Sequence, residues 1–483
     1  MAKQLFNSSE KSNFILNLTE EKYAKMASFG MLSALFMTSV ATAIPVIAHD
    51  SGLYVLSAAG LAVSGVICMI IAIIALMKKY ISGKLIFPAC AFGAMLVWGV
   101  ISLINSFDKG ISLYGYNGRG EGLLAIAFYG CFFITAASLR RDKAFSTVIN
   151  GLVGVGILNS VFGLIQIITG KLSHFRMIAL EIQANAAAGL SQSPLFLAMT
   201  LTLSLTAALI AFVCTKEKAK KLIYIASACL FSFVMMFTYS FIGICGAAFA
   251  VIAAVVIVFA AKVNKANLLA PLAVIVPAAA AVLIVNSGII GTLDSYRLYD
   301  GRILWFADAY YRVSASGAPD SKKVDIDDTY DVYYTLNRKT SNIISQHKLT
   351  GTGPDQLVFP QLYTYGDYVP EDGEVSVESV VIQNSGTFDK VYNEYLYTAA
   401  TRGIPSLIAL IAVLLPVLFI GYKNSKAGDW RRKCIFVLTL GGMLIFFIGC
   451  SNTAFAPMFW TLAGCSVAQI AAPEKKEEPE KAE

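Results

Sequence analysis

Apolar segments long enough to cross a lipid bilayer recur along almost the whole of this 483-residue chain. A transmembrane helix needs about 20 consecutive apolar residues. Hydrophobic residues make up 57% of the chain and charged residues only 14%, so we predict an all-α polytopic membrane protein. About twelve transmembrane helices are expected, at residues 27–48, 53–77, 85–104, 122–138, 146–169, 191–214, 221–238, 241–261, 267–289, 404–421, 434–451 and 453–471.

The charges between these segments predict how the chain is oriented in the membrane. One set of alternate loops is basic, and it holds Lys78, Lys79, Lys84, Arg140, Arg141, Lys143, Lys216, Lys218, Lys220, Lys221, Lys262, Lys265, Lys423, Lys426, Arg431, Arg432 and Lys433. The other short loops hold only Lys109, Arg119, Lys171 and Arg176. By the positive-inside rule, the basic loops are cytoplasmic. We therefore expect a multi-pass cell-membrane protein whose two termini are both cytoplasmic.

The net charge of +7 is explained by this orientation and by contact of the loops with anionic lipid headgroups. It gives no reason to expect a nucleic-acid partner. Residues 1–26 form a cytoplasmic N-terminus in this scheme. The mixed-charge residues 472–483 form a cytoplasmic tail that is expected to be disordered.

One long polar stretch, residues 290–403, separates the nine spans within 27–289 from the three within 404–471. The alternation of loops places it outside the cell. Because a structureless loop of this length is uncommon in a compact domain, part of it should fold. Apolar residues at helical spacing predict one helix over 301–313. A second helix is expected over 328–347.

A further helix is expected to close this stretch. Asp389 suits its N-cap, Gly403 its end, and Pro405 the first turn of the next span. The polar face of this helix would lie at the outer boundary of the membrane, and it consists of Lys390, Asn393, Glu394, Tyr397 and Thr401.

Cysteine and histidine usage argues against a metal site. The nine cysteines lie in or beside the expected spans, and the three histidines are scattered. No metal-ligand spacing occurs, so we predict neither a metal nor another cofactor.

Several short phrases carry a resemblance to a known family. In chain order they are Gly-Arg-Gly-Glu-Gly at 118–122, Ser-Pro at 193–194, Thr-Tyr-Ser at 238–240, Gly-Arg-Ile-Leu-Trp at 301–305, Leu-Thr-Gly-Thr-Gly-Pro-Asp at 349–355, Asn-Glu-Tyr-Leu at 393–396 and Arg-Gly-Ile-Pro-Ser-Leu at 402–407. Their order and the expected topology resemble the O-antigen ligase family over residues 100 to 465.

This resemblance implies a membrane glycosyltransferase that acts in cell-surface polysaccharide assembly. The family joins or polymerises glycans carried on polyprenyl diphosphate. The implied partners are a polyprenyl-diphosphate-linked glycan, such as an undecaprenyl-diphosphate-linked one, a glycan or lipid acceptor, and membrane lipids. Ligation and polymerisation both remain open.

Transfer from a diphosphate requires cations that stabilise the departing group. Arginine suits this task because its planar fork binds phosphate oxygens and stays charged when desolvated. Arg302 is the first candidate for this role and Arg119 the second. The alternative for both is an interfacial arginine that anchors a helix to headgroups. Lys390 is a candidate for diphosphate contact, and Arg402 is expected to interact with carbonyl groups at its helix end.

Family members usually carry histidine and arginine at the positions of Tyr392 and Phe241. Tyr392 is a candidate for ligand contact, the alternative being an aromatic-belt tyrosine. Glu394 is a candidate base, the alternative being a solvated helix carboxylate. Asn393 and Tyr395, on the same helix, are candidates for substrate binding.

Two other function classes remain open. A carrier or flippase for lipid-linked sugars would show charges buried in the middle of its spans, and this chain has almost none there. A non-catalytic relative that binds glycan lipids is motivated by Tyr392 and Phe241.

Overall fold

The computed structural model of the chain describes residues 18–48, 53, 55–116, 119–169, 187–238, 240–287, 329–358 and 390–469. Helices account for 80% of these residues, and no strand occurs among them. The all-α prediction is therefore confirmed for the described part of the chain. Arg302, the expected helix at 301–313 and Asp389 lie outside the described residues.

Nine of the described helices are long and apolar enough to cross a membrane. They are α2 (Glu20–Ala48), α3 (Val55–Met77), α4 (Ile86–Ile104), α7 (Asp142–Thr169), α8 (Pro194–Cys214), α9 (Lys218–Met236), α10 (Phe241–Ala260), α11 (Leu272–Ser287) and α16 (Glu394–Ala427). Short 3-10 turns at Gly83–Leu85 and Lys265–Leu269 precede α4 and α11 and belong to the same candidate spans, which run over Gly83–Ile104 and Lys265–Ile284. Each long helix overlaps one of the expected spans.

The other three expected spans coincide with shorter helices, namely α6 (Leu123–Ala137), α17 (Trp430–Ile445) and α18 (Ala456–Val467). At 1.5 Å per residue, the 12 residues of α18 cover about 18 Å, whereas a hydrocarbon core is about 30 Å thick. Glycine and polar residues at 449–453 separate α17 from α18. This non-helical segment, residues 446–455, runs through the site described below.

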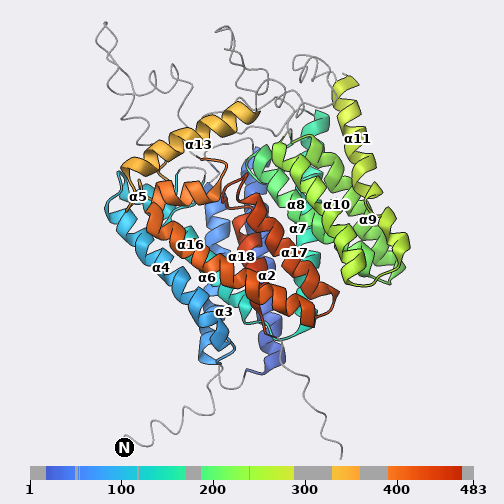
Figure 1. Cartoon of the computed structure of the whole chain (residues 1–483), viewed down its shortest axis with the longest axis horizontal. Helices are drawn as coiled ribbons and strands as arrows, with labels where there is room; N and C mark the ends of the chain where they lie inside the picture. The colour runs from blue at the N-terminus through green and yellow to red at the C-terminus, as the bar shows by residue number, and fades with distance from the viewer. Residues whose placement is uncertain are drawn as a thin grey trace, which may run out of the picture.

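Helix α8 lies at the centre of the bundle, and 94% of its apolar window is buried. It packs against α7, α9, α10 and α17 (Figure 1). Outer helices instead expose large apolar side chains such as Phe87 of α4 and Phe259 of α10. Because water would not favour such surfaces, they suit contact with lipid chains.

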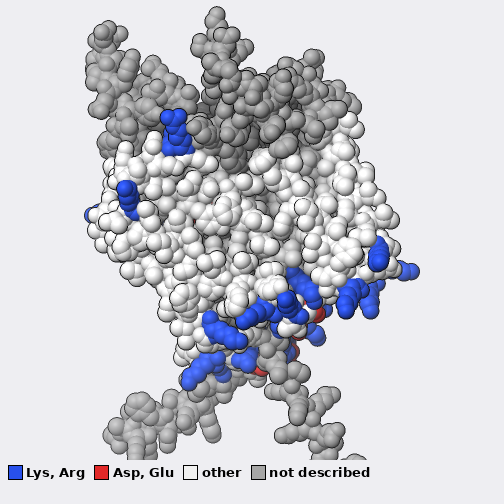
Figure 2. Space-filling model, in the orientation of Figure 1, with Lys and Arg blue, Asp and Glu red and all other residues white. Residues whose placement is uncertain are grey.

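Charged side chains are distributed unevenly over the surface. Figure 2 shows lysines and arginines gathered at one end of the bundle and an almost uncharged band across its middle. The basic end carries the loops that join α3 to α4, α6 to α7, α8 to α9 and α16 to α17. The sequence thus places its basic loops on a single side of the bundle.

Helix α13 (Thr329–Gln346) confirms the helix expected at 328–347. It lies across the end of the bundle away from the basic loops and packs against α16 (Figure 1). Its own residues Leu336 and Ile343 are buried, whereas Arg338 is exposed. The short helix α5 (Lys109–Tyr114) lies near the same end.

The prediction that Asp389 caps the closing helix is wrong. Helix α16 begins at Glu394, and the Asn393 side chain accepts hydrogen bonds from the backbone N–H groups of Tyr395 and Leu396 at 3.0 and 3.1 Å. Asparagine satisfies first-turn donors as well as aspartate does. The break at Gly403 is confirmed: its φ of 80° and ψ of 163° interrupt α16.

Candidate functional site

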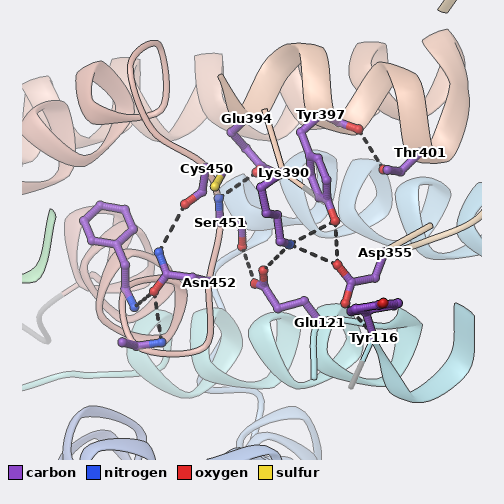
Figure 3. Close-up of polar contacts among 12 residues, drawn as sticks. Tyr116, Glu121, Asp355, Lys390, Glu394, Tyr397, Thr401, Cys450, Ser451 and Asn452 are labelled. Atoms are coloured by element: carbon purple, nitrogen blue, oxygen red, sulfur yellow. Dashed lines mark hydrogen bonds and ion pairs between the residues drawn. The ribbon is translucent and has the colours of Figure 1, made fainter. Parts of the chain in front are cut away.

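Three segments that are distant in the sequence meet at the end of the bundle that carries α13. They are the loop at 115–122 before α6, the loop at 349–356 after α13, and residues 390–402 at the start of α16. Each segment contributes buried charged groups, and Figure 3 shows these groups pointing toward one another. We call Glu121, Asp355, Lys390 and Tyr397 the charge cluster.

Lys390 is the centre of the charge cluster. Its Nζ lies 2.7 Å from Oε2 of Glu121 and 3.1 Å from Oδ1 of Asp355. It also donates to the Tyr397 hydroxyl at 2.9 Å. The side chain is only 1% exposed, so a lone charge here would be costly. Two carboxylates supply the compensation that a buried ammonium requires.

The remaining oxygens of both carboxylates also have donors. Glu121 Oε1 accepts from the hydroxyls of Tyr129 at 2.9 Å and Ser451 at 2.8 Å. Asp355 Oδ1 accepts from the Tyr397 hydroxyl at 2.6 Å, and Oδ2 accepts from the backbone N–H of Tyr116 at 2.7 Å. A fully satisfied polar network of this kind fixes one arrangement of its parts.

A second buried ion pair adjoins the charge cluster. Arg402 Nη2 lies 3.2 Å from Glu394 Oε1 and donates to the Thr398 hydroxyl at 2.6 Å. Ser451 joins the two groups, because its N–H donates to Glu394 and its hydroxyl to Glu121. Glu394 is thus not a solvated carboxylate. Arg402 pairs with that carboxylate, which corrects its expected role at helix-end carbonyls.

Backbone hydrogen bonds hold the Leu-Thr-Gly-Thr-Gly-Pro-Asp loop, residues 349–355, against α16. The N–H groups of Thr352 and Gly353 donate to the carbonyls of Ala400 and Thr401 at 3.0 and 2.9 Å. At Gly351, with φ of 67°, a Cβ would lie 2.4 Å from the carbonyl carbon of Thr401. Glycine is required there by both conformation and space. This close approach places Asp355 over Tyr397.

Gln356 ties the same loop to the segment before α6. Its Oε1 accepts from the N–H of Asp108 at 3.1 Å, and its Nε2 donates to the Ser112 hydroxyl at 2.9 Å and to the carbonyl of Asp108. The two loops are therefore joined at Gln356 as well as at the charge cluster. Pro354 and Asp355 form a turn between these contacts.

The charge cluster is expected to stabilise the fold across the whole neutral pH range. Burial alone would raise the pKa of Asp355, but the charge of Lys390 and the hydrogen bond from Tyr397 outweigh it and lower that pKa. Burial likewise disfavours charged Lys390, yet Asp355 and Glu121 raise its pKa well above the usual value.

From these shifts we predict the pH dependence of the Asp355→Asn variant. A lowered carboxyl pKa adds stability that is complete above the unfolded value of about 4 and is lost as pH falls through the folded one. A raised lysine pKa adds stability that is complete below about pH 10 and is lost only at higher pH. The melting-temperature difference between wild type and variant should stay constant from about pH 5 to 9 and shrink below about pH 4. A difference that changes near pH 7 would contradict this assignment.

The structure places the other predicted residues as follows. Asn393 caps α16, and the Tyr395 hydroxyl donates to the carbonyl of Met443 at 3.1 Å. Tyr392 is 5% exposed, which is too buried for an aromatic-belt tyrosine. The Arg119 guanidinium lies 5.5 Å from the centre of the Phe196 ring. Arg302 lies outside the described residues.

The structure therefore brings Lys390, Glu394, Asn393 and Tyr395 into one region, but gives each of them protein partners. Our candidates omitted Glu121 and Asp355, although both lie within the phrases that carry the family resemblance. For Glu121, the sequence signal that could have identified it is a charged residue between two glycines, as in Gly-Arg-Gly-Glu-Gly.

A small cavity lies beside the charge cluster. It is about 30 Å³ in volume and is lined by groups that include Glu121, Asp355, Glu394, Arg402 and Ser451. Such a space holds about two water molecules. It is too small for a sugar. Among the described residues, no three metal-ligating side chains gather closely enough to hold a metal ion.

Over the residues that the structure describes, the chain is thus an all-helical protein with nine helices long and apolar enough to cross a membrane, and it contains a buried polar site. Comparison of the chain with models of known protein families gives no match, and comparison with curated proteins also gives none.

Proposed function

We propose that this chain is a membrane glycosyltransferase that moves a glycan from polyprenyl diphosphate to a glycan or lipid acceptor. One observation carries the proposal. The phrases at 118–122, 349–355 and 393–396, through which the chain resembles the O-antigen ligase family, meet at one end of the bundle. Lys390 pairs with Glu121 and Asp355, and Ser451 joins Glu121 to Glu394. If each of these sequence phrases served only its own local loop, the three would not be expected to meet in one place.

The orientation follows from the charges. The basic end faces the cytoplasm under the positive-inside rule, so the charge cluster and residues 290–403 lie on the extracytoplasmic side. Both termini are then cytoplasmic. Transfer would occur at the outer boundary of the cell membrane, where a lipid-linked donor presents its glycan.

In the proposed reaction, an acceptor hydroxyl oxygen bonds to the anomeric carbon of the donor sugar. The bond from that carbon to the phosphate oxygen breaks, and polyprenyl diphosphate leaves with the electron pair. The hydroxyl proton passes to the leaving diphosphate. Glu394, the sequence candidate for the base, is buried and is held by Arg402. Tyr392, the sequence candidate for ligand contact, is also buried.

We assign the charge cluster a positioning role. Lys390 is neutralised by two carboxylates, so it holds the loops together and leaves the diphosphate to the arginines. Arg302 and Arg119 are the proposed cations, because guanidinium groups can stabilise the departing charge.

Replacing Arg302 with alanine is expected to lower the rate of transfer by at least about 100-fold, since the leaving group would lose a cation in the transition state. The assay uses the purified chain in proteoliposomes with a polyprenyl-diphosphate-linked glycan. The control is Arg338→Ala, which removes an exposed arginine of α13 and should leave the rate unchanged. Equal rates for both variants would remove Arg302 from the site.

The alternative of a non-catalytic relative that binds glycan lipids makes a different prediction. Wild type would then show no transfer, and Tyr392→His, which places the family's usual residue there, would raise it. A flippase, the other alternative, would move labelled lipid across the bilayer without transfer. The buried charges Glu394 and Arg402 lie in the first nine residues of α16 and pair with each other, so they do not line its middle.

A further inference from the structure

The loop that follows α13 begins beside α4, below the end of that helix. The carbonyl oxygen of Leu349 accepts a hydrogen bond of 2.7 Å from the indole Nε1–H of Trp98. Trp98 is six positions before Ile104, the last residue of α4, which corresponds to about 9 Å along the helix axis. Four residues further along the loop, Gly353 lies against Ser106, just past the end of α4. The loop therefore rises along the last turns of α4.

The outward surface of both helices beside this loop is apolar. Val97 and Ile104 of α4 are exposed on either side of the level of Trp98. Helix α16 packs against α4 (Figure 1), and the Leu349 carbonyl lies against its break at Gly403. The next residue of α16, Ile404, is also partly exposed. The loop thus lies between two helices whose outward side chains suit contact with lipid chains.

The Leu349 side chain continues this apolar surface. It is 68% exposed, although its backbone is held by Trp98 on one side and faces Gly403 on the other. A single exposed leucine on a soluble surface is ordinary. Here the leucine lies at the level of a helix that is long and apolar enough to span a membrane, and exposed apolar residues flank it.

The backbone of the loop has the hydrogen bonds that a position in lipid requires. Polar backbone groups within a bilayer must be satisfied by the protein, because no water is present there. The carbonyl of Lys348 accepts from the N–H of Ile404 at 2.8 Å, and the N–H of Gly351 donates to the carbonyl of His347 at 2.9 Å. The carbonyl of Leu349 is satisfied by Trp98, and the two N–H groups at 352–353 by α16.

The lysine before Leu349 is compatible with this position. Lys348 is exposed, and a lysine near a membrane boundary extends its ammonium to the headgroups while its methylene groups remain among the lipid chains. Its charge therefore sets the loop near the outer part of the hydrocarbon layer.

We propose that residues 348–353 lie within the membrane leaflet on the side away from the basic loops, with the Leu349 side chain in contact with lipid acyl chains. The same loop carries Asp355 into the charge cluster. Lipid would then cover this side of the charge cluster and keep external water from it. The inference goes beyond the proposed function and does not depend on it.

Photochemical cross-linking tests the contact. The photoreactive residue p-benzoylphenylalanine is placed at position 349 of the full-length chain, which is irradiated in vesicles of phosphatidylethanolamine and phosphatidylglycerol and analysed by peptide mass spectrometry. We expect an adduct between residue 349 and a phospholipid acyl chain. The same residue at position 408, where Ile408 is 62% exposed on α16, is the positive control. Position 338, on the exposed face of α13, is the negative control and should give no such adduct.

Two results would overturn the inference. One is the lack of a lipid adduct at position 349 in protein that melts like wild type and gives the adduct at position 408. The other is an adduct between residue 349 and a second copy of the chain, which would make this surface a protein interface.

Leu349→Cys gives a second measurement if the photoreactive variant does not fold. Thiol reagents attack the thiolate, which is disfavoured in apolar surroundings, so a charged maleimide should modify Leu349→Cys at least about tenfold more slowly than Arg338→Cys. Peptide mass spectrometry separates residue 349 from the native cysteines. Equal rates at the two positions would place Leu349 in water and contradict the inference.

Discussion

Replacing Lys390 with methionine is expected to lower the free energy of unfolding by about 3–5 kcal/mol, the usual cost of removing one partner of a buried ion pair. Methionine matches the lysine side chain as far as Cε but leaves the carboxylates of Glu121 and Asp355 buried without their cation. In detergent micelles the melting temperature should fall by at least about 5 °C.

Lys348→Met is the matched control, because it removes an exposed lysine and should change the melting temperature by less than about 1 °C. Adding Glu121→Gln and Asp355→Asn to Lys390→Met should restore part of the loss, since no unpaired charge would then be buried. If Lys390→Met has the same melting temperature as Lys348→Met, the charge cluster does not join these loops.

Replacing Gly403 with alanine is expected to cost about 2–4 kcal/mol. The φ of 80° and ψ of 163° at Gly403 belong to a region that is essentially restricted to glycine. A Cβ there would lie 1.9 Å from the carbonyl oxygen of Leu349. The loop at 348–358 would have to move away from α16, and with it Asp355.

Hydrogen exchange measured by mass spectrometry checks this prediction. The N–H groups of Thr352 and Gly353, which donate to carbonyls of α16, should exchange faster in Gly403→Ala than in wild type. Gly93→Ala in α4 is the control, because nothing lies within 4 Å of its Cβ position and alanine favours a helix. Unchanged exchange at 352–353 in Gly403→Ala would show that the contact with Leu349 is not decisive.

Hydrophobic length predicted most of the helices, because each long apolar segment must satisfy its backbone internally within a bilayer. Hydrophobic length overestimated how far the last two helices, α17 and α18, extend toward each other. Apolar residues near 446–455 extend the hydrophobic pattern beyond Ile445, although the backbone there is non-helical. Glu394 accepts from the N–H of Ser451 and donates its own N–H to the carbonyls of Phe446 and Gly449. Helix boundaries set by such tertiary contacts are not visible in a local pattern.

The site was predicted in part. The phrases indicated which loops matter, and Lys390 and Glu394 were among the candidates. Their partners could not be inferred, because Glu121 lies 269 positions from Lys390 and local spacing gives no information on such pairs. A lysine on a polar helix face was expected to meet a ligand, whereas two distant carboxylates compensate its charge inside the protein.

The central claim is that the chain transfers a glycan from a lipid diphosphate. Its most direct test is incubation of wild type in proteoliposomes with a polyprenyl-diphosphate-linked glycan and an acceptor glycan, with both products quantified by mass spectrometry. We expect free polyprenyl diphosphate and the extended acceptor to appear in equal amounts. Intact donor and unchanged acceptor, from protein that is folded and binds the donor, would contradict it.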